Sequence, residues 1–149
     1  ELAGNLDLDY KIASNDIESQ TKFGKSLILP VNPIYAEKIT LGKKKYEFRK
    51  KLCTENIDKI YLYATSPVKK VVGEVEILEK YSMKKEKLWE ETCEESGISE
   101  EFFEEYFKNQ SRACAYKLGK AVRYETPVEL IRMGISYVPQ SYVYIKTRD

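Results

Sequence analysis

One stretch, GKKKYEFRKK at residues 42–51, sets both the predicted fold and the predicted chemistry of this chain. It holds six basic residues and one acid. The glycine suits the end of a helix, and successive side chains of an extended segment point to opposite faces. Alternation places Lys45, Glu47 and Arg49 on one face and Lys44, Tyr46 and Phe48 on the other, unless a β-bulge after Gly42 changes the register.

The single acid in this stretch has two interpretations. A glutamate flanked by lysine and arginine is held ionised, and such a cluster binds phosphate through its cations while the carboxylate accepts a base amine. The alternative is a solvent-exposed edge strand, in which lysines prevent sheet-to-sheet aggregation. The residues alone leave both interpretations open.

The segments on either side of residues 42–51 predict an α+β domain. Before it, an apolar strand at 26–31 leads into a helix that Asn32 caps and Pro33 opens. After it, alternating or aromatic-rich runs predict further strands at 60–65, 71–78, 113–118, 120–124 and 142–146. A short helical turn at 127–134 precedes the last strand. We expect a small mixed β-barrel of about five or six strands, with a helix after the first strand.

An acidic insertion interrupts the strands. Leu88 and Trp89 begin one apolar helical stripe, Gly97 ends that helix, and Ser99 caps the next. The second stripe contains the aromatics Phe102, Phe103, Tyr106 and Phe107. Aromatic stripes of this spacing are typical of a core, although they also suit base stacking. The glutamates on the opposite faces favour a solvated surface over a cation site.

Composition excludes several classes of enzyme. The 149 residues include 25 Lys+Arg, 24 Asp+Glu and no His, so histidine-based triads, proton shuttles and mixed Cys/His zinc sites are excluded. The net charge of +1 conceals a segment of net +7 at 25–85 and one of net −7 at 86–108. Because charges more than about 8 Å apart are screened at physiological salt, a ligand responds to the nearby patch.

Three widely spaced cysteines without a C-x-x-C pair predict reduced thiols in a cytoplasmic protein, with no metal and no cofactor. No apolar run is long enough to span a membrane, so no membrane partner is expected. Residues 1–24 lack periodicity and are interpreted as a linker or the tail of an upstream region. The compact domain is expected at 25–149.

The pattern Gly42-x-Lys44-x-x-Glu47-x-Arg49 resembles the G-x-K-x-x-E-x-R signature of ASCH domains, which are related to PUA domains. Its setting is similar as well. The signature follows a strand–helix unit at 27–41 and precedes YLYATSPV at 61–68, and the chain ends with PQSY at 139–142. The resemblance covers residues 26–146.

This resemblance implies a PUA-like barrel that binds RNA, a nucleotide or a modified nucleobase, with a role in the regulation of transcription or translation. The cleft residues it implies are Lys44, Glu47 and Arg49, joined by Tyr63, Thr65, Ser66, Gln140 and Tyr142. A neighbouring domain in a longer polypeptide is a further expected partner.

An alternative comes from one ASCH branch that hydrolyses N4-acetylcytidine with a lysine, a threonine and a glutamate. Lys44 matches the lysine, but Glu47 stands at the threonine position, and the helical acid aligns near Ser96 with Glu95 adjacent. An amidohydrolase using Lys44 as the polarising group and Glu47 as the base therefore stays open, as does the question of whether the protein is an enzyme.

Overall fold

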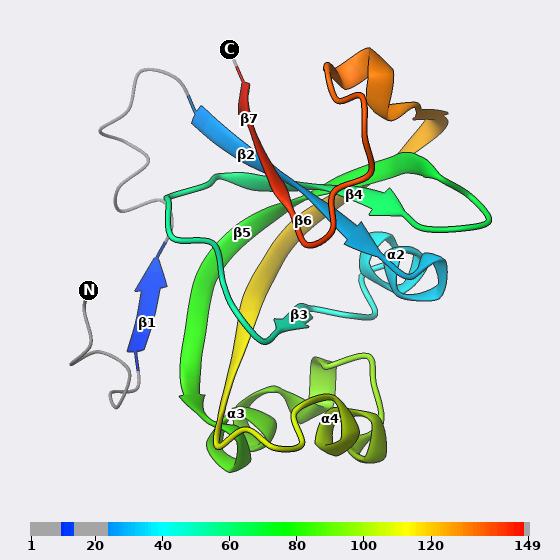
Figure 1. The fold of residues 1–149 in the computed structure, drawn as a ribbon. Coiled ribbons are helices and arrows are strands. Elements are labelled where there is room, and N and C mark those ends of the chain that lie inside the picture. Colours follow the sequence, from blue (N-terminus) through cyan, green and yellow to red (C-terminus); the bar gives the residue numbers. More distant parts are fainter. Residues whose placement is uncertain (1–9, 14–23, 148–149) are drawn as a thin grey trace.

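The computed structural model describes residues 10–13 and 24–147, and within them a mixed, strongly curved sheet carries three helices (Figure 1). The strands are β1 (Tyr10–Ala13), β2 (Gly24–Val31), β3 (Tyr46–Arg49), β4 (Lys59–Ala64), β5 (Lys70–Lys84), β6 (Arg112–Val128) and β7 (Val143–Thr147). The helices are α2 (Pro33–Thr40), α3 (Lys85–Thr92) and α4 (Glu100–Tyr106). Short 3₁₀ turns at Cys93–Glu95 and Leu130–Met133 complete the described part.

The sheet is open. Its hydrogen-bonded order is β3-β6-β5-β4-β2-β7, with β1 paired to β5 beside this path. The β2–β4 pair is parallel and the other pairs are antiparallel. The predicted α+β class, the helix after the first strand of the domain and the two-helix acidic insertion are all confirmed, but the expected barrel does not close.

The expected boundary between a linker at 1–24 and the domain stays a prediction, because residues 1–9 and 14–23 lie outside the described residues. Between them, β1 pairs with β5, from Tyr10 opposite Ser82 to Ala13 opposite Glu79.

Helix α2 begins and ends where its sequence predicts. The Asn32 side chain accepts a hydrogen bond from the Ile34 backbone N–H at 2.9 Å, and Pro33 stands at the first helical position. Gly42 follows with φ +78°, a conformation that glycine adopts readily. The helix buries Ala36 and Ile39 against the main core of β2, β4 and β5.

Two strands are longer than the sequence indicated. The predicted strands 113–118 and 120–124 are one strand, β6, since Gly119 lies inside it where the pairing with β5 shifts register around Glu76. Strand β5 likewise continues past residue 78 to Lys84. These two strands run together down one side of the molecule and carry the α3–α4 insertion at their end (Figure 1).

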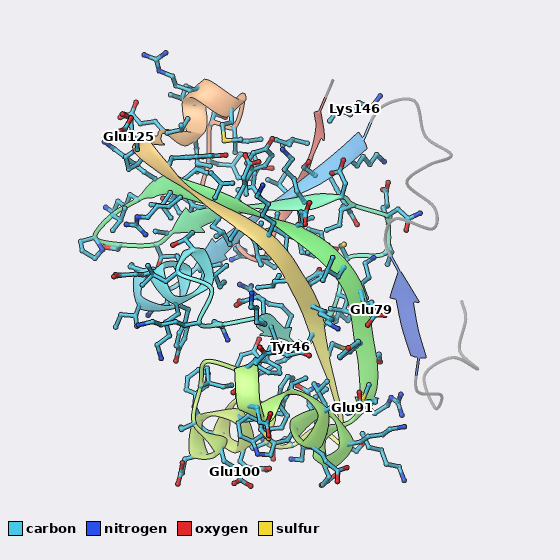
Figure 2. All side chains as sticks on the ribbon, turned by 180° about the vertical axis from the view of Figure 1, so that it is seen from behind. Tyr46, Glu79, Glu91, Glu100, Glu125 and Lys146 are labelled. Atoms are coloured by element: carbon cyan, nitrogen blue, oxygen red, sulfur yellow. The ribbon has the colours of Figure 1, made fainter. Side chains whose placement is uncertain are left out.

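A second core joins the insertion to the sheet. Phe103 of α4 and Phe107, which caps its C-terminal end, are fully buried against Phe48 of β3, with Leu88 of α3 beside them. Side chains of the insertion lie close to Tyr46, whereas Glu100 is at the outer end of the molecule (Figure 2). The insertion is therefore packed onto the strand that contains the signature, and this packing forms the pocket described next.

Candidate functional site

A pocket of about 250 Å³ lies where α2, β3 and α4 meet. It contains the three signature side chains Lys44, Glu47 and Arg49. Its remaining lining residues are Val31, Asn32, Tyr35, Phe48, Ile98, Phe102 and Tyr106. The three residues that the sequence predicted to form the centre of the site are thus brought together.

Glu47 and Arg49 form an ion pair on β3. Both the Nε and one terminal nitrogen, Nη2, of Arg49 donate to the same carboxylate oxygen, Oε2, at 3.2 and 3.0 Å. Nη2 also donates to the Pro30 carbonyl at 2.5 Å, which ties the pair to the end of β2. Among the described residues, the Glu47 Oε1 atom accepts no hydrogen bond and the Arg49 Nη1 atom donates none. One acceptor and one donor are therefore left for a ligand.

Lys44 is buried beside this pair, with only 2% of its surface exposed. Its ammonium donates to the Ser96 carbonyl at 2.7 Å and lies 5.2 Å from the centre of the Tyr35 ring and 5.0 Å from that of Phe48. Burial lowers the pKa of Lys44 to about 8, although Glu47 acts in the opposite direction. Near pH 8 this side chain is therefore a mixture of ammonium and neutral amine.

The turn after α3 holds Lys44 in place. Gly97 has φ +75°, and a Cβ atom on it would lie 2.5 Å from the Cγ of Lys44. Two further contacts fix the turn, since Lys38 donates to the Gly97 carbonyl at 3.0 Å and the Lys45 backbone N–H donates to the Glu95 carbonyl at 2.8 Å. The insertion thus closes one side of the pocket through its backbone.

Aromatic rings form the walls. Tyr35 contacts Phe102 edge to face with ring centres 5.7 Å apart, and Phe102 lies parallel to Tyr106 at 6.2 Å. Burial, together with the charge of Glu47, raises the pKa of both tyrosines, so their hydroxyls stay protonated at neutral pH. Flat apolar walls around a carboxylate and a guanidinium suit a planar heterocycle with its own donors and acceptors.

The predicted alternation of faces is wrong for Lys44. Strand β3 begins only at Tyr46, so the residues between Gly42 and Tyr46 do not follow the strand alternation. Lys44 joins Glu47 and Arg49 in the pocket, as the family signature implied, whereas strict alternation without a bulge after Gly42 placed Lys45 with them.

The five other predicted site residues do not line this pocket. Tyr63 is buried in a separate core cluster with Ile28, Val71 and Leu130. Tyr142 packs against the main core and against Tyr144. Thr65 is half-buried, and Ser66 and Gln140 are exposed, outside the lining set.

Sequence reasoning missed Asn32, Tyr35 and Gly97 as contributors to the site. Phe102 and Tyr106 belonged to a stripe that was interpreted as core, with base stacking as the alternative. The available signal was that the stripe consists of two adjacent aromatic pairs, Phe102/Phe103 and Tyr106/Phe107. In each pair the second residue faces the core and the first faces the pocket. No local pattern signals the contact between Gly97 and Lys44, which are far apart in the sequence.

The position that aligns with the helical acid of the acetylcytidine-hydrolysing branch contributes backbone groups. Ser96 accepts from Lys44 through its carbonyl, and its hydroxyl is bonded to the carbonyls of Cys93 and Ile98. Within residues 10–13 and 24–147, no three His, Cys, Asp or Glu side chains are grouped to hold a metal ion. No helix in the same ranges is long and apolar enough to cross a membrane.

Comparison with known proteins gives a consistent family match. The family model described as ASCH domain matches residues 29–125. A curated protein of Zymomonas mobilis subsp. mobilis, named ASCH domain-containing ribonuclease, is 30% identical over 95 residues, which are 63% of this chain and 64% of that protein. The crystal structure of ASCH from Zymomonas mobilis superposes with a TM-score of 0.74 at 26% identity, covering 80% of this chain and 87% of that one.

Two proteins of Ureaplasma parvum serovar 3 are also similar. ATP synthase subunit alpha is 27% identical over 135 residues, which are 90% of this chain but 16% of that protein. Large ribosomal subunit protein uL22 is 28% identical over 88 residues, which are 59% of this chain and 28% of that protein. This chain therefore spans less than two thirds of the length of each of these curated relatives.

Proposed function

This chain belongs to the ASCH domain family, and from that premise we propose that it binds RNA by taking one nucleobase into the pocket of Lys44, Glu47 and Arg49. The observation that carries the proposal is the pairing of an open acceptor, Glu47 Oε1, with an open donor, Arg49 Nη1, between aromatic walls. A base amine donates to the first while a ring nitrogen or carbonyl accepts from the second.

The size of the pocket supports a single base. Its volume of about 250 Å³ lies below the roughly 300–1,000 Å³ that is typical of pockets for drug-sized ligands. The walls formed by Tyr35, Phe102 and Tyr106 offer stacking, which contributes about 1–3 kcal/mol per base in single-strand recognition. The name of the Zymomonas relative, a ribonuclease, makes RNA the first ligand class to test.

The test is a titration of short labelled RNA and DNA oligonucleotides, followed by fluorescence anisotropy. We expect RNA binding that weakens as salt rises and that Arg49→Ala lowers at least tenfold. Arg49→Lys, which keeps the charge but loses the paired geometry, separates the local role from misfolding. Arg132→Ala, at an exposed arginine outside the pocket, is the matched control. Equal affinity in the wild type and both Arg49 variants contradicts the proposal.

A second candidate function is hydrolysis at the same pocket, and the lowered pKa of Lys44 is the observation that favours it. A neutral amine accepts a proton in general base catalysis, and Arg49 lies beside it to stabilise negative charge. For RNA, the base takes the 2′-hydroxyl proton, the 2′-oxygen attacks the adjacent phosphorus, and the 5′-oxygen leaves with a proton from water. For N4-acetylcytidine, Lys44 polarises the acyl oxygen while Glu47 activates a water that cleaves the amide.

Two incubations decide between binding alone and hydrolysis. Labelled RNA is analysed for cyclic-phosphate products, and N4-acetylcytidine is analysed for released cytidine by chromatography. Product in the wild type that is absent with Lys44→Met supports the corresponding reaction. If neither substrate gives product above the Lys44→Met level, binding without hydrolysis remains. A regulatory role beside a neighbouring domain is a separate proposal, tested by the sequence of the complete gene.

A further inference from the structure

The residue after the signature, Lys50, lies at the rim of the pocket. Its side chain is exposed, and its ammonium is 5.2 Å from the centre of the Tyr106 ring, which forms one pocket wall. A lysine over an aromatic face is held by cation–π attraction and keeps its N–H donors available. The ammonium thereby lies beside one wall of the pocket.

The backbone at Lys50 contacts the neighbouring strand β6. Its carbonyl accepts a hydrogen bond from the Cys114 thiol at 3.8 Å. In the described part of the chain, no carboxylate lies within 4 Å of the Lys50 ammonium. A cation at the rim of a pocket, with no carboxylate beside it, favours the binding of an anionic group there.

The rest of α4 opposes an anion. Its exposed glutamates Glu100, Glu101, Glu104 and Glu105 line one acidic depression of their own. Glu100 lies at the outer end of the molecule, away from the sheet (Figure 2). The glutamates repel phosphate along this face of α4, whereas Lys50 attracts it. This charge distribution favours a nucleic-acid strand that runs past Lys50 and away from the glutamates.

We propose that Lys50, seated on Tyr106, forms a phosphate subsite for a nucleotide whose base occupies the pocket. The inference rests on the proposed function and narrows its ligand class to phosphorylated nucleotides, either free or within an RNA strand. Since the pocket has room for about one base, the sugar and the phosphate of that nucleotide lie at the rim, where the ammonium is.

The experiment uses the full chain and three proteins: wild type, Lys50→Gln and Lys120→Gln. Lys120 is also exposed, but it lies on β6 outside the pocket, so it controls for the loss of one positive charge. The probes are the four ribonucleosides, their 5′- and 3′-monophosphates, and an eight-nucleotide RNA, titrated by calorimetry at two salt concentrations. The monophosphates and the RNA distinguish a free nucleotide from a strand as the source of the phosphate.

We expect at least one monophosphate to bind more tightly than its nucleoside, by about fivefold at low salt. Lys50→Gln removes this gain and leaves nucleoside affinity unchanged, whereas Lys120→Gln keeps the gain. With RNA, Lys50→Gln lowers the slope of log affinity against log salt by about 0.7, the value for one phosphate contact on a single strand.

Monophosphates that bind no better than nucleosides overturn the phosphate subsite, as does a gain that survives in Lys50→Gln. In both cases Arg49-dependent binding of nucleosides leaves the proposed function standing. If no nucleoside, nucleotide or RNA binds in an Arg49-dependent manner, the proposed function itself fails, and the subsite fails with it.

Discussion

Two carboxylate–cation pairs in this molecule have almost the same nitrogen–oxygen distance but different surroundings. Glu47 and Arg49 are joined at 3.0 Å, and Glu74 of β5 and Lys59 of β4 are joined at 3.1 Å. Both oxygens of Glu74 are occupied, because Tyr124 donates to the second at 2.6 Å. Only one oxygen of Glu47 is occupied by a described residue, and the Glu47 side chain is 9% exposed against 28% for Glu74.

One-third of the residues in this chain are charged, so an ion pair alone does not indicate a binding site. The difference between the Glu47 and Glu74 pairs shows what else is needed. The Glu74 pair lies beside its own depression, lined by Asp58, Glu76 and Lys120 among others, so charge and concavity are present there as well. What it lacks is an unfilled hydrogen-bonding position between aromatic walls. Among the described residues no fully buried side-chain nitrogen or oxygen lacks a partner, so the open oxygen of Glu47 faces the pocket space, where a ligand can reach it.

The largest expected effect comes from breaking the burial of Lys44. Gly97→Ala places a Cβ atom 2.5–2.8 Å from three carbons of the Lys44 side chain, at a positive φ. We expect a loss of about 3–4 kcal/mol in the free energy of unfolding, from overpacking and backbone strain together, measured by urea denaturation.

The matched control is Gly134→Ala. Gly134 also has positive φ, at +85°, but a Cβ atom there meets nothing within 4 Å. Backbone strain alone predicts a loss of about 1–2 kcal/mol. Equal losses at the two glycines would show that Gly97 is required only for its backbone conformation.

The second prediction contrasts how Lys44 and Lys59 make the free energy of unfolding depend on pH. Lys44 has a pKa of about 8 in the folded state and an ordinary 10.5 in the unfolded state, so the unfolded chain binds more protons between these values. Stability relative to Lys44→Met therefore rises by about 3 kcal/mol from pH 8 to 10.5. Burial disfavours the charge of Lys59 too, but its bond to Glu74 outweighs this and raises its pKa.

The wild type relative to Lys59→Met consequently shows no such rise over the same interval, and its advantage declines only above the ordinary lysine pKa. Comparing each variant with the wild type at every pH cancels the ionisation of the many tyrosines. Parallel pH profiles for the two variants would mean that Lys44 titrates as a solvated lysine.

The third prediction compares the two carboxylates directly. Glu47→Gln retains the shape of the side chain but removes the charge that faces the pocket, and we expect RNA affinity to fall at least tenfold, about 1.4 kcal/mol. Glu74→Gln, whose oxygens are already occupied, should leave RNA affinity within twofold of the wild type. Anisotropy titrations of the same oligonucleotide provide both numbers. Similar losses in both variants would indicate diffuse electrostatic binding instead of a pocket.

The sequence predicted more of the fold than of the site, for physical reasons. Caps and apolar runs are local, so α2 after Asn32, α4 after Ser99 and the positions of the strands could be predicted. Glu47 and Arg49 were placed on one face because they lie within β3, where alternation holds.

Face alternation misplaced Lys44, which the family signature had grouped with Glu47 and Arg49, because the residues that precede β3 follow no repeating geometry. Its real position depends on Ser96 and Gly97, which reach it only after β5 and α3 have been built. The distinction between Phe102 and Phe103 is similarly tertiary: both belong to one aromatic stripe, but only Phe103 faces the core, while Phe102 lines the pocket. Closure of a barrel was likewise not decidable from strand count, because it depends on whether the edges β3 and β7 pair.

The smallest expected effects come from removing one hydroxyl at each pair. Tyr124→Phe deletes the 2.6 Å bond to Glu74 and should cost about 1 kcal/mol of unfolding free energy with no change in RNA affinity. Tyr106→Phe keeps the ring that forms the pocket wall and carries Lys50, so RNA affinity should change by no more than about twofold. Calorimetric melting and anisotropy on the two variants measure both quantities. A large loss of affinity in Tyr106→Phe would mean that the Tyr106 hydroxyl, near Glu47 and Arg49, contacts the ligand directly. The ligand would then be recognised by the edge of the ring and not by its face.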